Sequence, residues 1–294
     1  MRSIYNILRF ILTHPLARSN KTEALKRFFF YQVSKLFNPY PIVYSFTDKT
    51  KLIVEKGMTG ATGNIYCGLH EFEDMAFLLH FLRPDDLFVD VGANVGSYTV
   101  LASGHVGANT IAFEPVPFTF KRMQNNLAIN YLNSKVIAYN VGVGSKEEML
   151  RFTSNLDTVN HVAMDSTATN VVEVKVETLD HLLNGLHPSL IKIDVEGFET
   201  EVLRGASSVL DDEHLRAIII ELNGSGKFYG FSDEEIHQKL IDFHFHPFTY
   251  EPYFRTLTQR KSFGDTNTIY LRDFSYVSLR VKNSLPFNVL GHLI

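Results

Sequence analysis

The chain has 294 residues, 45% of them apolar, and a formal net charge of -4. This length and composition are ordinary for a globular protein with a substantial core, and the negative balance argues against a nucleic-acid partner, which needs many basic contacts. The single cysteine, Cys67, excludes an intramolecular disulfide and a cysteine-based zinc or redox pair.

The first 40 residues are unusually basic, with seven Lys or Arg and one acid, Glu23. The apolar run IYNILRFIL is interrupted by Arg9 and is shorter than the roughly 20 residues that a membrane-spanning helix needs; it also makes a poor signal peptide. We expect a basic helical extension with lead-in strands over residues 1–60. Two interpretations stay open: helices that pack on the main domain of a cytoplasmic protein, or peripheral contact with an anionic membrane surface.

From Leu87 onward, short apolar runs alternate with stretches of helical spacing, which predicts parallel strands joined by crossover helices. The expected strands are LFVDV, TIAFEP, KVIAYNV, LIKIDV and AIIIEL. The expected helices are PFTFKRMQNNLAINYL, GFETEVLRGASSVL and SDEEIHQKLIDFHF, the last with Ser232 as N-cap. Because each strand is almost entirely apolar, both faces of the sheet should be covered, as in a doubly wound α/β fold.

Two regions depart from this alternation. MLRFT and VVEVKVETL are predicted as antiparallel strands around a long polar loop, SNLDTVNHVAMDSTATN, that reaches over the site. A late pair, HPFTYEP and NTIYLRD, should complete the sheet at its far edge. We place the main domain at residues 61–275 and a C-terminal tail at 276–294.

The stretch FVDVGANVGSYT indicates a nucleotide site at the end of the first core strand. In open α/β sheets, ligands bind outside the carboxyl ends of the strands, where the strand order reverses. Gly92 and Gly96 allow a tight turn and close approach to a ligand, and the helix that begins near Val95 directs N–H groups to the same space. The spacing G-x-x-x-G lacks the pyrophosphate turn of an NAD site, which disfavours an oxidoreductase.

Two acids on successive strands specify the nucleotide further. Asp90 suits a ligand with a cationic amino group, and Glu114, at the end of the next strand, is placed to accept hydrogen bonds from two ribose hydroxyls. A ligand with an amino group and a ribose but no diphosphate matches S-adenosylmethionine. The structural alternative is that Asp90 caps the turn and Glu114 is a solvated acid.

The segments FVDVGANVGSYT, IAFEPVP, LIKIDVEGFETEVLRGA and IIIELN, in this order, resemble the FkbM family of S-adenosylmethionine-dependent methyltransferases over about Tyr66 to Tyr270. The resemblance implies a class I methyltransferase fold and O-methylation, in most members of a sugar or polyketide-type hydroxyl. It further implies that Glu114 holds the ribose, that Asn140 lies near the adenine, and that Glu71 sits in a segment folded over the cofactor. The residues that it places around the methionine portion are Asp90, Gly92, Asn94 and Gly96.

Methyl transfer to an alcohol requires alignment of the reacting atoms and removal of a proton from a weakly acidic hydroxyl. Asp194, Glu196 and Glu221 follow or end strands at the same sheet edge as Asp90. They are candidates for a general base or for ligands of Mg²⁺, which would acidify the hydroxyl. His161, in the polar loop, is the other candidate base because histidine titrates near neutral pH.

Each of these candidates has a plainer explanation. Asp194 would cap the helix that starts near Gly197 or pair with a cation, Glu199 and Glu201 would be solvated helix residues, and Glu71 would cap the helix starting near Phe72.

For the whole chain, the leading hypothesis is an O-methyltransferase acting on a sugar, glycan or other polyhydroxylated small molecule. The alternative is a noncatalytic cofactor-binding domain that retains the fold.

Overall fold

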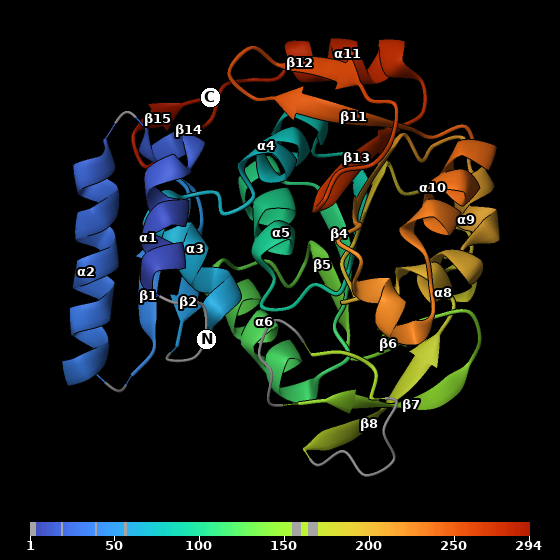
Figure 1. Cartoon of the computed structure of the whole chain (residues 1–294), viewed down its shortest axis with the longest axis horizontal. Coiled ribbons are helices and arrows are strands. Elements are labelled where there is room, and N and C mark those ends of the chain that lie inside the picture. The colour runs from blue at the N-terminus through green and yellow to red at the C-terminus, as the bar shows by residue number, and fades with distance from the viewer. Residues whose placement is uncertain (1–3, 19, 39, 56–57, 155–159, 164–169) are drawn as a thin grey trace.

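The computed structural model describes residues 4–18, 20–38, 40–55, 58–154, 160–163 and 170–294, and at its centre is an eight-stranded sheet (Figure 1). The strand order is β12-β11-β13-β10-β9-β3-β4-β5. The five strands from β10 to β5 run parallel, and β13 lies antiparallel between β10 and β11. The strands are β3 (Leu87–Val91), β4 (Asn109–Phe113), β5 (Val136–Tyr139), β9 (Leu190–Ile193), β10 (Ala217–Glu221), β11 (His246–Glu251), β12 (Thr256–Gln259) and β13 (Asn267–Leu271).

Helices cover both faces of this sheet, because alternate residues of each central strand point to opposite faces. Phe88 of β3 belongs to one buried cluster, while Val89 and Val91 belong to another. The first face carries α4 (Phe72–Phe81), α5 (Ser97–Val100), η2 (Leu101–Val106), α6 (Pro117–Ile129) and α11 (Phe274–Lys282). The second carries α7 (Leu179–Leu182), α8 (Glu199–Arg204), α9 (Ser207–Asp211) and α10 (Asp233–Asp242). The doubly wound, mostly parallel α/β prediction is therefore confirmed, and the layers correspond to a class I methyltransferase fold.

The strand order reverses between β3 and β9. From β3 the chain proceeds to β4 and β5 on one side, and later to β9 and β10 on the other. Asp90 on β3 and Asp194 after β9 therefore stand on either side of the switch point, where such sheets bind ligands.

The far edge of the sheet differs from the prediction. The late pair does join the sheet, but β13 is inserted between β10 and β11 and the edge strand is β12, which the sequence analysis missed. The stretch predicted as one helix after Gly197 is two short helices, α8 and α9, separated at Gly205 and Ala206.

A second, three-stranded sheet lies beside the main one (Figure 1). The two predicted antiparallel strands are present as β7 and β8, and β8 also pairs in parallel with β6. Most of the polar loop between β7 and β8, residues 155–159 and 164–169, lies outside the described residues. The strands are β6 (Gly142–Val143), β7 (Glu148–Thr153) and β8 (Val171–Glu177).

The N-terminal segment forms a helical layer against the main domain. Its buried residues, including Phe28 and Tyr31, cluster with Tyr66 and with Val95 of the glycine loop. A domain boundary at residues 60 and 61 falls inside α3. Within the residues that the structure describes, no helix has both the length and the apolarity needed to cross a bilayer. The elements are α1 (Ile4–Thr13), η1 (Pro15–Ala17), α2 (Lys21–Phe37), β1 (Ile42–Ser45), β2 (Lys51–Val54) and α3 (Thr59–Cys67).

The C-terminal segment packs into the main core. Val277 and Val281 of α11, with Phe287 and Ile294, are buried in the same cluster as Phe88. A boundary at residues 275 and 276 therefore falls within α11. A hairpin of β14 (Asn288–Val289) and β15 (His292–Leu293) closes the chain.

Candidate active site

The loop after β3 has the predicted tight turn. Gly92 and Gly96 have φ of 80° and 83°, and Asn94 between them has φ of 52°, a region that glycine and asparagine tolerate best. The Asn94 Oδ1 atom accepts a hydrogen bond from the N–H of Val95 at 2.8 Å. The helix begins at Ser97, two residues later than predicted.

The space beside both glycines is filled by protein. A Cβ on Gly92 would lie 1.8 Å from the carbonyl oxygen of Asp194, and one on Gly96 would lie 2.9 Å from Cγ of Met123. We expected these glycines to admit a ligand. Instead they let the loop pack against the segment after β9 and against α6, so Gly92 sets how closely the two halves of the site approach.

Asp90 is a buried carboxylate that is only half satisfied. Its Oδ2 atom accepts a hydrogen bond from the Thr99 hydroxyl at 2.6 Å, whereas its Oδ1 atom is buried and has no partner in the described part of the chain. Burial raises the pKa of Asp90, against the opposing effect of Lys192. A buried acceptor without a donor costs free energy, so this oxygen suits a ligand that donates.

Glu114 directly follows β4 and holds the glycine loop. Its Oε2 accepts a hydrogen bond from the N–H of Asn94 at 3.0 Å, and its Oε1 accepts one from the N–H of Val116 at 2.9 Å. The side chain is thus buried and bonded, and the solvated alternative is wrong. Burial raises its pKa to about 7. Each carboxylate oxygen has a second acceptor position, so further donors can bind.

Asn140 continues the same edge of the sheet. It follows β5, and its Nδ2 donates to the carbonyl oxygens of Glu114 and Pro115, both at 2.8 Å. Asn94, Glu114 and Asn140, which follow β3, β4 and β5, are therefore connected by hydrogen bonds.

Glu71 lies at the start of α4, but its side chain does not cap that helix. Its Oε2 accepts a hydrogen bond from the Tyr98 hydroxyl at 2.8 Å, and its Oε1 accepts one from the Asn267 amide at 2.9 Å. Glu71 therefore joins α4, α5 and β13 close to the glycine loop.

The three carboxylates predicted at this sheet edge, Asp194, Glu196 and Glu221, lie close together, and we call them the rim. Oxygen atoms of Asp194, Glu196 and Glu221 lie within 4.8 Å of one another. Burial, followed by the charge of Asp194, raises the pKa of Glu196 to about 8 and that of Glu221 to about 9. The Oε2 atom of Glu221 is buried without a partner among the described residues. Such a cluster of oxygen ligands suits a hard divalent cation, and equally suits a carboxylate that accepts a proton.

Lys192 is a site residue that the sequence analysis missed. It is 3% exposed within β9, and its ammonium donates to Oδ2 of Asp194 at 2.7 Å. Burial alone would lower the pKa of Lys192, but the nearby carboxylates of Asp194, Glu71 and Asp90 outweigh it and raise that pKa. A lysine within an otherwise apolar strand was the available signal, because a buried charge requires partners. Asp194 does pair with a cation, as the alternative proposed.

Glu199 was also misjudged. It is 2% exposed rather than solvated, and its Oε1 accepts hydrogen bonds from the N–H groups of Val195 and Gly197 at 3.1 and 3.2 Å. Burial raises the pKa of Glu199 to about 7. Glu199, rather than Asp194, thus fixes the turn that carries Glu196.

His161 borders this rim without joining the carboxylate cluster found among the described residues. Its ring lies 5.6 Å from that of Phe228 in η4 (Ser225–Tyr229), centre to centre. The Tyr229 hydroxyl donates to the carbonyl oxygen of Val162 at 3.0 Å. This described part of the polar loop is therefore anchored to the segment that follows β10.

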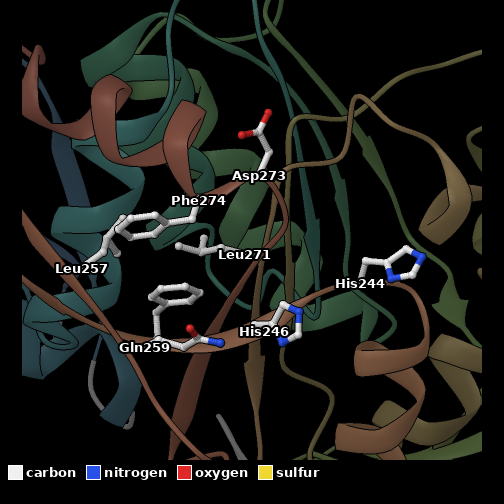
Figure 2. Close-up of a pocket in the computed structure, with 8 residues that line it drawn as sticks. His244, His246, Leu257, Gln259, Leu271, Asp273 and Phe274 are labelled. Atoms are coloured by element: carbon white, nitrogen blue, oxygen red, sulfur yellow. The ribbon is translucent and has the colours of Figure 1, made fainter.

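A cavity of about 240 Å³ lies elsewhere, between β11, β12 and α11. Figure 2 shows Phe274 and Leu257 on one side of it and His244 and His246 on the other. Leu271 on its wall pairs with Ala217, the first residue of β10, so the cavity lies at the opposite end of the sheet from Glu221. None of the predicted site residues lines it.

Two residues with reactive or polar side chains, Cys67 and Tyr250, belong to the buried core. Cys67 is buried, and burial raises its pKa to about 12, so it is a packed thiol and not a nucleophile. Tyr250 is also fully buried, with its hydroxyl 2.5 Å from Nδ1 of His80. It is a core residue of β11.

Comparison with known proteins identifies relatives of this chain. It is 33% identical over 168 residues to Methyltransferase 1 of Beauveria bassiana, covering 47% of this chain and 66% of that one. It is 30% identical over 156 residues to hexuronic acid methyltransferase AglP of Haloferax volcanii, and this match covers 52% of this chain and 62% of that protein. The matches thus span just under two thirds of these relatives' length. A crystal structure of methyltransferase FkbM from Methylobacillus flagellatus is similar with a TM-score of 0.46 and 16% identity, over 72% of this chain and 52% of that one.

A family model also matches the chain. It is that of the methyltransferase FkbM domain, and it matches residues 90–249, more than half of the sequence. The match begins at Asp90 and includes Glu114, Asn140 and the three rim carboxylates. The chain belongs to the FkbM methyltransferase family.

Proposed function

We propose that this chain transfers a methyl group from S-adenosylmethionine to a hydroxyl of a sugar, glycan or other polyhydroxylated small molecule. The observation that carries the proposal is the position of Asp90 and Glu114, two buried carboxylates on neighbouring strands at the switch point. The names of two relatives, hexuronic acid methyltransferase and 31-O-demethyl-FK506 methyltransferase, support a hydroxyl-rich acceptor.

The proposed cofactor role rests on carboxylate oxygens of Asp90 and Glu114 that can accept further hydrogen bonds beyond those that the described residues supply. The unpaired Oδ1 of Asp90 would accept from the cofactor's ammonium, and the remaining acceptor positions of Glu114 would hold the ribose hydroxyls. Asn94 and Asn140 border the same edge, and Glu71 closes it from α4. When bound, S-adenosylmethionine supplies a methyl group activated by the sulfonium charge.

We assign removal of the proton from the acceptor hydroxyl to the rim carboxylates. Asp194 is the carboxylate that we assign to this task, because Lys192 holds its Oδ2 in place and because it stands across the switch point from Asp90. A general base of this kind contributes about 100-fold or more to the rate. His161 remains the alternative base, next to Phe228.

The same rim fits Mg²⁺. Asp194, Glu196 and Glu221 would hold the ion through carboxylate oxygens, and the ion would lower the pKa of the acceptor hydroxyl. With Lys192 included, three ionised carboxylates and one ammonium leave two negative charges, which a divalent cation would balance. Burial, and after it the charge of the neighbouring carboxylates, raises the pKa of both Glu196 and Glu221, and a bound cation would favour their ionised forms.

Calorimetric titration with S-adenosylmethionine, and with NAD as comparison, tests the cofactor. Glu114→Ala should weaken binding by about 1.5 to 3 kcal/mol, the scale of lost charge-assisted hydrogen bonds. Glu213→Ala, which changes an exposed acid in the turn before β10, should leave binding unchanged. A folded parent protein that fails to bind S-adenosylmethionine would refute the proposal.

Mass analysis of products from a panel of hexose and uronic acid glycosides tests the acceptor class. A gain of one methyl group that depends on S-adenosylmethionine is expected for at least one glycoside. Tight cofactor binding without methylation of any glycoside, lipid-linked sugar or polyketide alcohol would favour the noncatalytic alternative.

A further inference from the structure

The second helix of the chain, α2, has large apolar side chains on its exposed side as well as on its buried side. Phe30, Leu36 and Phe37 are 76%, 78% and 82% exposed, and Phe29 and Val33 are more than half exposed. Monomeric globular proteins seldom leave contiguous apolar surface of this size uncovered.

These residues form one stripe. Positions 29, 33, 36 and 37 recur at the three- and four-residue spacing that places side chains on one side of a helix, and position 30 flanks them. Tyr40, just beyond the helix, is also exposed. We call these six residues the α2 stripe: Phe29, Phe30, Val33, Leu36, Phe37 and Tyr40.

The opposite side of α2 is already used for packing. Ala24, Phe28 and Tyr31 are buried against α3, and the Arg27 side chain donates to the carbonyl oxygen of Tyr66 at 3.0 Å. Figure 1 places α2 at the outer edge of the molecule, with α1 and α3 between it and the main sheet. The stripe therefore faces away from the core and is not explained by the fold.

Basic residues precede the stripe along α2. The first 40 residues contain seven Lys or Arg and one acid, and that acid, Glu23, is paired with Lys26 at 2.7 Å. Lys21 and Lys26 are exposed in the first two turns of α2, just before the stripe, whereas Lys35 in the last turn lies 5.0 Å from the centre of the buried Tyr31 ring. The remaining residues contain more acids than bases, so the net charge is positive only in the first 40 residues.

We propose that the α2 stripe docks on an anionic lipid surface, with its aromatic side chains in the headgroup region and the lysines against lipid phosphates. A helix that lies in the membrane plane needs an apolar side and a basic rim, and aromatic residues suit the interfacial depth. A second copy of the chain fits less well, because it would leave the exposed Lys21 and Lys26 without an anionic partner. An acidic protein partner would explain the lysines but not six adjacent apolar side chains.

Vesicle sedimentation tests the proposal with the full chain. The parent protein should bind vesicles of phosphatidylcholine with about 30% phosphatidylglycerol, bind pure phosphatidylcholine vesicles much less, and lose most binding in about 0.5 M NaCl. Substituting three stripe residues, Phe29→Ser, Phe30→Ser and Phe37→Ser, should lower the partition coefficient at least about tenfold. Lys21→Gln with Lys26→Gln should lower it for anionic vesicles only.

A matched control removes three equally exposed apolar residues elsewhere: Met149→Ser, Phe254→Ser and Leu285→Ser. This control should sediment like the parent, and circular dichroism should show both triple variants folded. The proposal is overturned if the parent ignores anionic vesicles, or if the control loses as much binding as the stripe variant. It is also overturned if light scattering finds a dimer that the stripe substitutions dissociate while vesicle binding is unchanged. Cofactor binding does not enter these measurements, so they are independent of the proposed enzyme activity.

Discussion

The ammonium of Lys192 lies 2.7 Å from Oδ2 of Asp194 and 4.6 Å from the centre of the Tyr98 ring. One buried cation thus connects the proposed base after β9 with the first helix after the glycine loop. Because Tyr98 in turn donates to Glu71 at 2.8 Å, the two halves of the site share a single polar network. Its members act as a unit, since each buried charge depends on the others for compensation.

Replacing the cation should therefore destabilise the whole network. Lys192→Met keeps the apolar stem but leaves the carboxylates of Asp194, Asp90 and Glu71 uncompensated. We expect the free energy of unfolding in urea to fall by about 2 to 4 kcal/mol, less than a fully buried pair would give because the Asp194 side chain is 26% exposed. Adding Asp194→Asn to Lys192→Met should recover part of the loss.

The control is Lys175→Met, whose ammonium pairs with Glu147 and Glu177 at 3.0 Å on the surface. Solvent screens such pairs, so little change in stability is expected. Equal stability of the parent and Lys192→Met would show that the network does not support the fold.

The contact between Gly92 and Asp194 gives a second stability test. Gly92→Ala should be more destabilising than Gly230→Ala by at least about 2 kcal/mol, because the two glycines have the same φ of 80° but differ in surroundings. A Cβ at Gly92 meets the Asp194 carbonyl at 1.8 Å, whereas at Gly230 nothing lies within 4 Å. Unfolding curves of the two variants, measured together, separate steric overlap from backbone strain, and equal losses would contradict the packing described.

Cofactor affinity should depend on pH through Glu114. Burial raises the pKa of this carboxyl to about 7, and only the carboxylate accepts from two ribose hydroxyls while keeping both backbone hydrogen bonds. Affinity for S-adenosylmethionine should be constant above about pH 8 and about tenfold weaker at pH 6, one unit below the pKa. Glu114→Gln should bind more weakly but lose this dependence, and the same pH profile in both proteins would assign it to another group.

The sequence predicted the parts of the site that depend on local patterns. Apolar runs that end in an acid place Asp90 and Glu114 at one edge of a parallel sheet, because the carboxyl ends of parallel strands coincide there. The meeting of Asp194, Glu196 and Glu221 follows from the same rule, applied to the strands LIKI and AIIIE.

What the sequence analysis missed depends on contacts between distant segments. The insertion of β13 between β10 and β11 is a matter of strand order, which depends on pairing between distant segments and which no run of residues encodes by itself. The role of Gly92 is set by the Asp194 carbonyl, about a hundred positions away along the chain. The plainer interpretation of Glu199 was a solvated helix residue, yet the turn at Gly197 brings backbone donors to it.

The rim decides between a metal-assisted and a metal-free mechanism. Asp194→Asn preserves shape but removes the charge that would accept the proton or bind the ion, so turnover should fall about 100-fold or more. Cofactor affinity should change little, and Asp211→Asn, at an exposed helix end, should match the parent.

If Mg²⁺ is required, EDTA should abolish activity and added Mg²⁺ should restore it, since oxygen ligands release a hard cation readily. Glu221→Gln should then raise the Mg²⁺ concentration needed for half-maximal activity. Activity that survives EDTA would eliminate the metal and leave Asp194 as the base, with His161→Ala as the next variant to assay. Full turnover in Asp194→Asn would remove the rim from the mechanism and leave Asp194 as the structural partner of Lys192.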